Sequence, residues 1–432
     1  MMLAMIEAVG QNGYRATTVA DVIARAKVSR KTFYEHFANK QECMLSSADL
    51  VSAESIRRMQ RAYLTAESWR ERVRTALLAL FEAAIENPGA LRLSMIEIAA
   101  AGPAGIAHRE RSIASYENFI RDAQKLAPSA GTVSDTTLRA IVGGLNRVLY
   151  LYVTSGEHAN TPALVADLAN WTTSYYPTPQ AILHQAQVQP MSEPRARSPR
   201  DGGRAPGTLA PHPRRGARRG LPGGDQNVSR SFVVHNQRER ILDAVANLTA
   251  AEGYEALGVE HIAEAAAVSL EAFYEHFAGK EDSFLVAYEI GHNKILAHVR
   301  GAYNEQSDWR YGVRAAVSAL FEFLASEPAF AHIALVDALS ATSRSAERSR
   351  IGVSGFAQML IPGLERVPEG TPPPPVTIEA ISGGIFEICL HYALQRRIQQ
   401  LPELTTSATY FALAPFIGSQ DAALVAARGE EA

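Results

Sequence analysis

The chain has 432 residues, of which 47% are hydrophobic and 20% charged, and its formal net charge is −3, values typical of a soluble globular protein with two or three domains. Its two cysteines, Cys43 and Cys389, exclude a disulfide framework and a cysteine-based metal site, so a cytoplasmic location is expected. No stretch approaches the roughly 18 apolar residues of a membrane span, so no membrane partner is predicted.

The first elements in the chain predict a helix-turn-helix. The hydroxyl of Thr18 and the carboxylate of Asp21 are typical of a capping box, which marks the start of a helix. A short turn over 26–28 follows, and Ser29 is placed to cap a second helix that runs through Phe37. The second helix of such a unit has the dimensions to enter the major groove of DNA.

The second helix has one apolar and one polar face. Phe33 and Phe37 are four residues apart and are expected to point into the core. Cations, hydroxyls and a phenol remain for the outer face or its edge, which are the groups that contact base edges and phosphates. These residues are Arg30, Lys31, Thr32, Tyr34 and His36. The alternative for Tyr34 and His36 is packing against the first helix. The alternative for Arg30, Lys31 and Lys40 is an exposed charge that has no binding role.

Longer amphipathic helices follow. Apolar residues recur at spacings of three and four over 72–81, and the pattern ends at Asn87-Pro88-Gly89, a typical helix stop. The segments 137–152 and 163–175 have the same pattern. Because no strand-like alternation bounded by turn residues occurs, the predicted fold class is all-α.

Residues from about 190 to 232 differ from the rest in composition. Nine arginines stand there against three acidic residues, together with seven prolines and seven glycines. Such a segment lacks the apolar surface that would offset the entropy of ordering it, so a disordered basic linker is predicted. It acts either as a plain tether or as a loose contact for phosphates.

The whole chain repeats itself at an offset of 240 residues. Phe33–Ala38 recurs letter for letter as Phe273–Ala278, and the same offset relates Trp69 to Trp309 and Gly143-Gly144 to Gly383-Gly384. A constant offset over this length indicates a tandem duplication of one whole domain pair. The predicted domains are a first helix-turn-helix domain at 1–46, a first helical domain at 47–188, the linker at 189–234, a second helix-turn-helix domain at 235–286 and a second helical domain at 287–420.

The segments around 13–19 and 28–37, with Lys40, resemble the DNA-binding domain of TetR/AcrR-family transcriptional regulators, and 253–285 resembles it less completely. The resemblance implies two-fold paired units, each with a divergent helical domain that binds a small ligand and dimerises. It also implies phosphate contacts from Thr17, Thr18 and Lys40. The contacts implied for the second helix come from Ser29, Arg30, Lys31, Thr32, Tyr34 and His36, and the matching candidates of the second copy are Ser269, Tyr274, His276 and Lys280.

The two copies differ in charge at this site. Residues 13–42 carry six basic against three acidic side chains, whereas 253–282 carry one against seven. Leu270-Glu271 stand opposite Arg30-Lys31, and phosphates repel an acidic surface, so the second copy is expected to bind DNA weakly or not at all. The first copy lacks the basic arm that precedes the first helix of the second copy. Either its true start lies upstream or it binds more weakly than its helices suggest.

The last two helices of each copy, at about 134–156 with 162–176 and 375–396 with 402–417, are expected to pair the copies as a four-helix bundle. The glycine pairs within them indicate close approach of a partner helix, or else a local kink. An unidentified small-molecule effector is expected between the other helices, and no cofactor or metal is. Its candidate lining, for which plain core packing is the alternative, is Trp69, Phe81, Tyr116, Phe119, Tyr150, Trp309 and Phe321.

No set of a nucleophile, a base and a metal ligand at useful spacing is present, so an enzyme is not predicted. The function expected from these features is a sequence-specific DNA-binding regulator, by family analogy a ligand-responsive repressor. The alternative is a helical interaction or sensor protein that pairs with other regulators and no longer binds DNA specifically.

Overall fold

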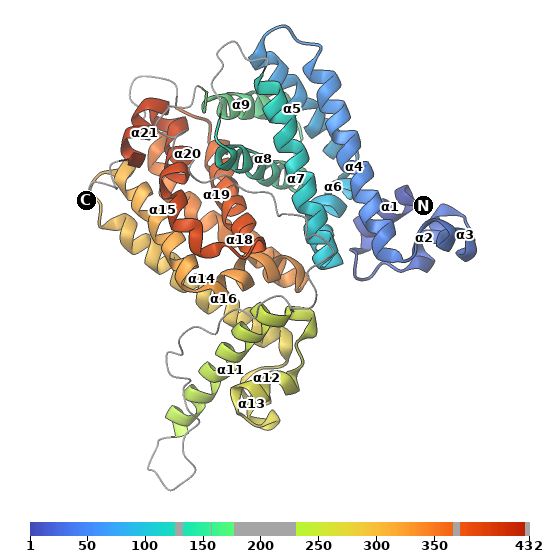
Figure 1. Ribbon diagram of the computed structural model, residues 1–432, viewed down its shortest axis with the longest axis vertical. Coiled ribbons are helices and arrows are strands. Elements are labelled where there is room, and N and C mark those ends of the chain that lie inside the picture. Colours follow the sequence, from blue (N-terminus) through green and yellow to red (C-terminus); the bar gives the residue numbers. More distant parts are fainter. Residues whose placement is uncertain (126–132, 157, 177–229, 366–371, 428–432) are drawn as a thin grey trace, which may run out of the picture.

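The computed structural model describes residues 1–125, 133–156, 158–176, 230–365 and 372–427. Within these residues every regular element is a helix, which confirms the predicted all-α class. Each copy consists of a small N-terminal three-helix domain, which we call its head, and a larger helical body (Figure 1). The two bodies lie side by side, and the two heads extend from them in different directions (Figure 1).

The head of the first copy contains α1 Met2–Asn12, α2 Val19–Ala26 and α3 Arg30–His36. The body of the first copy contains α4 Lys40–Tyr63, α5 Trp69–Glu86, α6 Pro88–Leu91, the π-helix η1 Arg92–Ile96, the 3-10 helix η2 Glu97–Ala101, α7 Pro103–Gln124, α8 Asp135–Ser155 and α9 Thr161–Thr173. The head core is formed by small and apolar residues that include Met5, Val22, Phe33, Cys43 and Met44, all fully buried.

The second copy repeats this order. Its head contains α11 Arg230–Glu252, the 3-10 turn η3 Tyr254–Ala256, α12 Val259–Ala266 and α13 Leu270–His276. Its body contains α14 Lys280–Asn304, α15 Trp309–Ser326, α16 Pro328–His332, the π-helix η4 Ile333–Asp337, α17 Ala338–Ser340, α18 Ser343–Leu360, η5 Ile361–Leu364, α19 Val376–Leu394, η6 Ile398–Leu404, α20 Thr405–Ile417 and α21 Ser419–Ala427.

The heads join the bodies through continuous helices. The predicted boundary at 46/47 falls inside α4, and that at 286/287 falls inside α14, so one continuous helix joins each head to its body. The predicted linker, 189–234, lies outside the described residues up to residue 229, and its last five residues begin α11. By length and hydropathy no described helix qualifies singly as a membrane span, and the one combination that does, Trp309–Ser326 with Pro328–Asp337, is bent by 104°.

The two bodies meet along a surface that we call the seam, formed by α8 and α9 of the first copy and α19 and α20 of the second. Helix α8 packs along α19, while α9 contacts α19 and α20 contacts α8. At one edge of the seam the rings of Tyr175 and Phe411 stack with centroids 5.1 Å apart, and the hydroxyl of Tyr175 donates to the carbonyl of Phe411 at 3.1 Å. The seam therefore belongs to the same hydrophobic core as the interiors of both bodies.

The glycine pairs lie where α8 and α19 cross. A Cβ atom on Gly143 would collide with the Cβ of Glu387, and one on Gly383 would collide with the Cβ of Arg147. The close helix approach expected from these glycines is confirmed, because any side chain at these positions would force α8 and α19 apart.

Candidate nucleic-acid interface

The helix-turn-helix of the first head is held by local hydrogen bonds. The hydroxyl of Thr18 accepts from the backbone N–H of Asp21, and the Asp21 carboxylate accepts from the backbone N–H and the hydroxyl of Thr18 at 2.8 and 2.7 Å, which completes the predicted capping box. These bonds hold the pKa of Asp21 below its usual range. The turn after α2 passes through Lys27, at φ 54° and ψ 43°, and Ser29 caps α3 by accepting from the N–H of Thr32 at 3.0 Å.

The outer face of α3 is basic and exposed. Phe33 is completely buried, as expected from the spacing of the apolar residues. Arg30, Lys31 and Tyr34 face solvent, and the guanidinium of Arg30 lies 5.9 Å from the ring centre of Tyr34. The side chain of Lys31 is 88% exposed and its nearest acid, Glu35, is 4.0 Å away, so the lysine is available to a phosphate. Ser29 and His36 are exposed as well, and Thr32 is half-buried beside the cap.

Two of the predicted phosphate contacts differ from the expectation. Thr17 is 1% exposed, and its hydroxyl donates to the carbonyl of Gly13 at 2.8 Å, so it does not reach the surface. Lys40 points into the head, where its Nζ donates to the carbonyls of Tyr14 and Thr17, both at 2.9 Å, and lies 4.1 Å from the ring centre of Tyr14. Burial lowers the pKa of Lys40. Because two of its three N–H donors are taken, we assign Lys40 a structural role in joining α4 to the loop after α1.

The second head has the same backbone with different chemistry on its surface. Ser269 caps α13 through the N–H of Ala272 at 3.1 Å, and Phe273 is completely buried. Lys280 repeats the inward bond of Lys40, donating to the carbonyl of Tyr254 at 3.2 Å. Tyr274 is 57% exposed and His276 is half-buried, but the positions of the two basic residues of α3 are taken by the exposed side chains of Leu270 and Glu271.

A cavity lies in the first copy between the body and α1 of the head, whose Leu3 and Ile6 contribute to its lining. It measures about 370 Å³ and opens between α4, α5, the π-helix η1 and α7. Its lining mixes apolar side chains with the charged groups of Glu54, Arg58 and Arg109. A cavity of this size and lining suits a small amphipathic molecule.

The predicted aromatic lining is divided among several places. Tyr116 lines the roomy cavity, and together with Trp69 and Phe119 it lines a narrower apolar one of about 50 Å³. Tyr150 lines a cavity of about 130 Å³ at the seam. The other three candidates lie in the packed core instead: Phe81 and Phe321 are fully buried, and the indole N–H of Trp309 donates to the carbonyl of Met359 at 2.9 Å. The helical spacing of aromatic residues does not separate the lining of a cavity from the packed core, because both surroundings are apolar.

A polar link that the sequence did not reveal connects this cavity to the first head. Ser94 and Met95 of η1 line the cavity, and Glu97, directly after η1, accepts from the backbone N–H of Tyr14 at 2.8 Å. Arg92 holds Glu97 by an ion pair of 3.2 Å and also donates to the carbonyl of Gly10 at 3.1 Å. The two ends of this link are 83 residues apart in the chain, so no local pattern marks it. A π-helix at such a place is typical of functional sites.

Fold and site together define an all-helical protein with two helix-turn-helix heads, one basic and one acidic, on a pair of joined bodies. Residues 4–46 and 241–286 match the family model of bacterial regulatory proteins of the tetR family. These segments cover the two heads, so the chain carries two DNA-binding domains of the TetR family in tandem.

Comparisons with individual proteins cover parts of the chain. A curated relative, the HTH-type transcriptional activator FasR of Mycolicibacterium smegmatis, is 32% identical over 111 residues, which are 26% of this chain and 50% of the relative, so the chain spans about half the length of that relative. Among solved structures, the fatty acid degradation regulator FadR of Bacillus halodurans matches with a TM-score of 0.37 at 20% identity, covering 41% of this chain and 94% of its own. The regulator PfmR of Thermus thermophilus gives 0.34 at 21% identity, covering 42% and 96%.

Proposed function

We propose that this protein is a sequence-specific, DNA-binding transcriptional regulator that works as its own dimer, with the first head as the main DNA-binding element. The observation that carries the proposal is α3, a capped helix after a tight turn with Arg30, Lys31 and Tyr34 exposed on one face. Arginine and lysine on a groove-binding helix recognise guanine edges and phosphates. The second head keeps this shape with Leu270 and Glu271 at the two basic positions, and under the proposal it contributes little or no affinity.

The proposal includes a small-molecule effector that acts through the first body. A ligand in the 370 Å³ cavity would contact Ser94 and Met95 of η1, and η1 leads directly to Glu97, which holds the head through the N–H of Tyr14. Movement of η1 would therefore change the orientation of α3 relative to the body. We propose that the protein is cytoplasmic and that its binding to a promoter represses transcription by blocking access of the polymerase. The curated relative is named as an activator, so a promoter–reporter assay with the intact chain decides the direction.

Selection of bound sequences from a random duplex pool by the intact chain tests the proposal. We expect a reproducible motif to be enriched, and the affinity for it to fall about 10-fold or more between 50 and 200 mM salt because phosphate contacts release counterions. Failure to enrich any motif, with no dependence on salt, would instead support the alternative of an interaction protein without specific DNA binding.

A further inference from the structure

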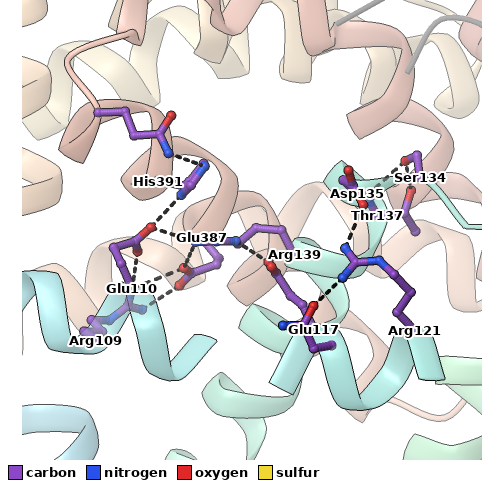
Figure 2. A network of polar contacts seen from close by, with 12 residues as sticks. Arg109, Glu110, Glu117, Arg121, Ser134, Asp135, Thr137, Arg139, Glu387 and His391 are labelled. Atoms are coloured by element: carbon purple, nitrogen blue, oxygen red, sulfur yellow. Dashed lines mark hydrogen bonds and ion pairs between the residues drawn. The ribbon is translucent and has the colours of Figure 1, made fainter. Parts of the chain in front are cut away.

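Several ion pairs cross the seam, among them those of Arg109 with Glu387, His391 with Glu110, Arg147 with Glu379 and Arg139 with Glu387. Arg147 of α8 donates from Nε to Oε2 of Glu379 of α19 at 3.1 Å, and its Nη2 lies 3.0 Å from the same oxygen. Nη1 of Arg139, two turns earlier on α8, lies 3.6 Å from Oε1 of Glu387, as Figure 2 shows among the polar contacts of this region. The side chains of Arg139, Glu387 and Arg147 are only 5%, 3% and 10% exposed, whereas that of Glu379 is 33% exposed. Charges at such positions are strongly destabilising when they lose their partners.

The internal repeat relates the pair of Arg147 with Glu379 to the pair of Arg139 with Glu387. At the offset of 240 residues, Arg139 corresponds to Glu379, and Arg147 corresponds to Glu387. The contact of Arg147 with Glu379 therefore maps onto the contact of Glu387 with Arg139, with the sign of every charge reversed. Both arginines lie on the first copy, and both glutamates lie on the second.

This arrangement of charges disfavours the pairing of two first copies or of two second copies. If two first copies met through the same surface, Arg147 of one would face Arg139 of the other, twice over. If two second copies met, Glu379 would face Glu387 in the same way. The crossing at Gly143 and Gly383 holds α8 and α19 close together beside these charges. Like charges at these distances, out of water, disfavour either pairing.

The restriction is strongest for the second copy. Arg139 has anionic partners in its own copy, Glu110 at 3.0 Å and Glu117 at 2.5 Å, both on α7 (Figure 2). The ion pairs found for Glu387 among the described residues all go to the first copy, to Arg109 and Arg139. A self-paired second copy would therefore bury Glu387 beside another carboxylate without the cations it has here.

A third charge reversal lies at the heads. Arg15 forms an ion pair with Glu255, and these residues also correspond to each other at the offset of 240. A residue that meets its own counterpart lies close to the pseudo-two-fold axis, where a symmetric pair would place two arginines or two glutamates together. Both groups are well exposed, so this pair adds selectivity rather than much stability.

We propose that the seam is a charge-coded interface that accepts a first copy only against a second copy of this chain, and excludes the self-pairing of either. The proposal rests on the pairing of the two halves described under Proposed function. Its consequence for that function is that each paired unit carries one basic and one acidic head, and never two basic heads. Two full chains can still exchange halves, provided that each first copy meets a second copy.

Single charge reversals in the full chain test the proposal without DNA. Arg147→Glu places two carboxylates together where Arg147 now meets Glu379, and Glu379→Arg places two guanidinium groups together at the same place. We expect each variant alone to lower the Tm by about 5 °C or more, because two like charges then replace the pair of Arg147 with Glu379. The double variant Arg147→Glu/Glu379→Arg restores an attractive pair in the same place, and it should recover at least half of that loss.

Mixing the two single variants gives the sharper result. The first copy of one and the second copy of the other then form complementary seams in both directions, so light scattering should show a complex of twice the 46.8 kDa of one chain. Arg121→Glu, which breaks the exposed pair of Arg121 with Asp135 inside the first copy, is the matched control and should not form such complexes.

Losses in the double variant that equal the sum of the single losses, or single variants with the wild-type Tm, would overturn the proposal. A double variant that fails to fold would do so as well, because complementarity would then not suffice. Because these measurements need no DNA, a failure to bind DNA would leave this test unaffected.

Discussion

The two heads show how one backbone can keep its shape while its surface chemistry changes. Both have a fully buried phenylalanine on the second helix, Phe33 or Phe273, a serine cap at its start, and a turn through a left-handed residue, Lys27 or Ala267. Both also bind the lysine of the following helix internally. They differ at the two exposed positions that begin the second helix, Arg30 and Lys31 against Leu270 and Glu271. The shared phenylalanines, caps and turns therefore reflect packing, and the function has to be judged from the exposed residues around them.

The largest effect is expected when the first head receives the surface of the second. In Arg30→Leu/Lys31→Glu two exposed cations are lost and one anion is added, so affinity for the selected DNA should fall about 100-fold or more, since one bidentate base contact alone contributes about 1–3 kcal/mol. Binding titrations at several salt concentrations measure this. The control is Leu270→Ala/Glu271→Ala in the second head, which should bind as the wild type does. Equal losses in both would mean that the heads contribute equally.

The inward lysines provide a test of stability. Lys40→Met retains the alkyl chain but removes two charge-assisted hydrogen bonds, so unfolding of the first head should become easier by about 2 kcal/mol. Lys280→Met, which removes the longer bond to the carbonyl of Tyr254, should have a smaller effect on the second head. Denaturant unfolding gives the loss of stability. If Lys40→Met instead left stability unchanged and reduced the salt dependence of DNA binding, Lys40 would be a phosphate contact, as first expected from the sequence.

A gain of function in the second head would sharpen the comparison further. Leu270→Arg/Glu271→Lys changes two exposed side chains at the start of α13 and restores the charge pattern of α3. We expect affinity for DNA containing two inverted copies of the selected motif to rise about 10-fold in a titration. No gain would show that features other than these two residues, such as the acidic residues on and around α12, keep the second head from DNA.

The smallest expected difference lies in the caps of α2 and α12. Thr18→Ala should destabilise the first head by about 1 kcal/mol, whereas Gly258→Ser, which adds a hydroxyl at the uncapped start of α12, should stabilise the second. The pKa of Asp21 is lowered by the bonds from Thr18, so this contribution is present at neutral pH and is lost as the pH falls below about 4. Unfolding at pH 7 and pH 3 measures both effects, and an unchanged difference between wild type and Thr18→Ala at pH 3 would contradict the assignment.

Features fixed by neighbours in the chain were predictable from the sequence. The capping box at Thr18, the serine cap of α3 and the stop of α5 before Pro88 depend on spacings of a few residues. The close approach at Gly143 was also predictable, because a glycine weakens an apolar helix and is favoured there where a neighbouring backbone comes near.

Features that depend on the relative placement of distant helices were not predictable in this way. Lys40 was expected to contact phosphate from the resemblance to the family, but the carbonyls it binds come from a loop 23 to 26 residues earlier. The partners of Arg147 and Arg139 lie in the other copy, and only the register of α8 on α19 decides which charges meet. Aligning the copies at their offset does reveal the reversed charges at these positions, but not that they are neighbours.

A footprint of the intact chain on DNA enriched from a random pool tests the central claim, that only one of two joined heads binds the major groove. If that is correct, protection will be strong over one major-groove segment and weak or absent on the other side. Two equally protected segments one helical turn apart, about 34–36 Å, would contradict it, because the acidic head would then bind DNA as well as the basic one.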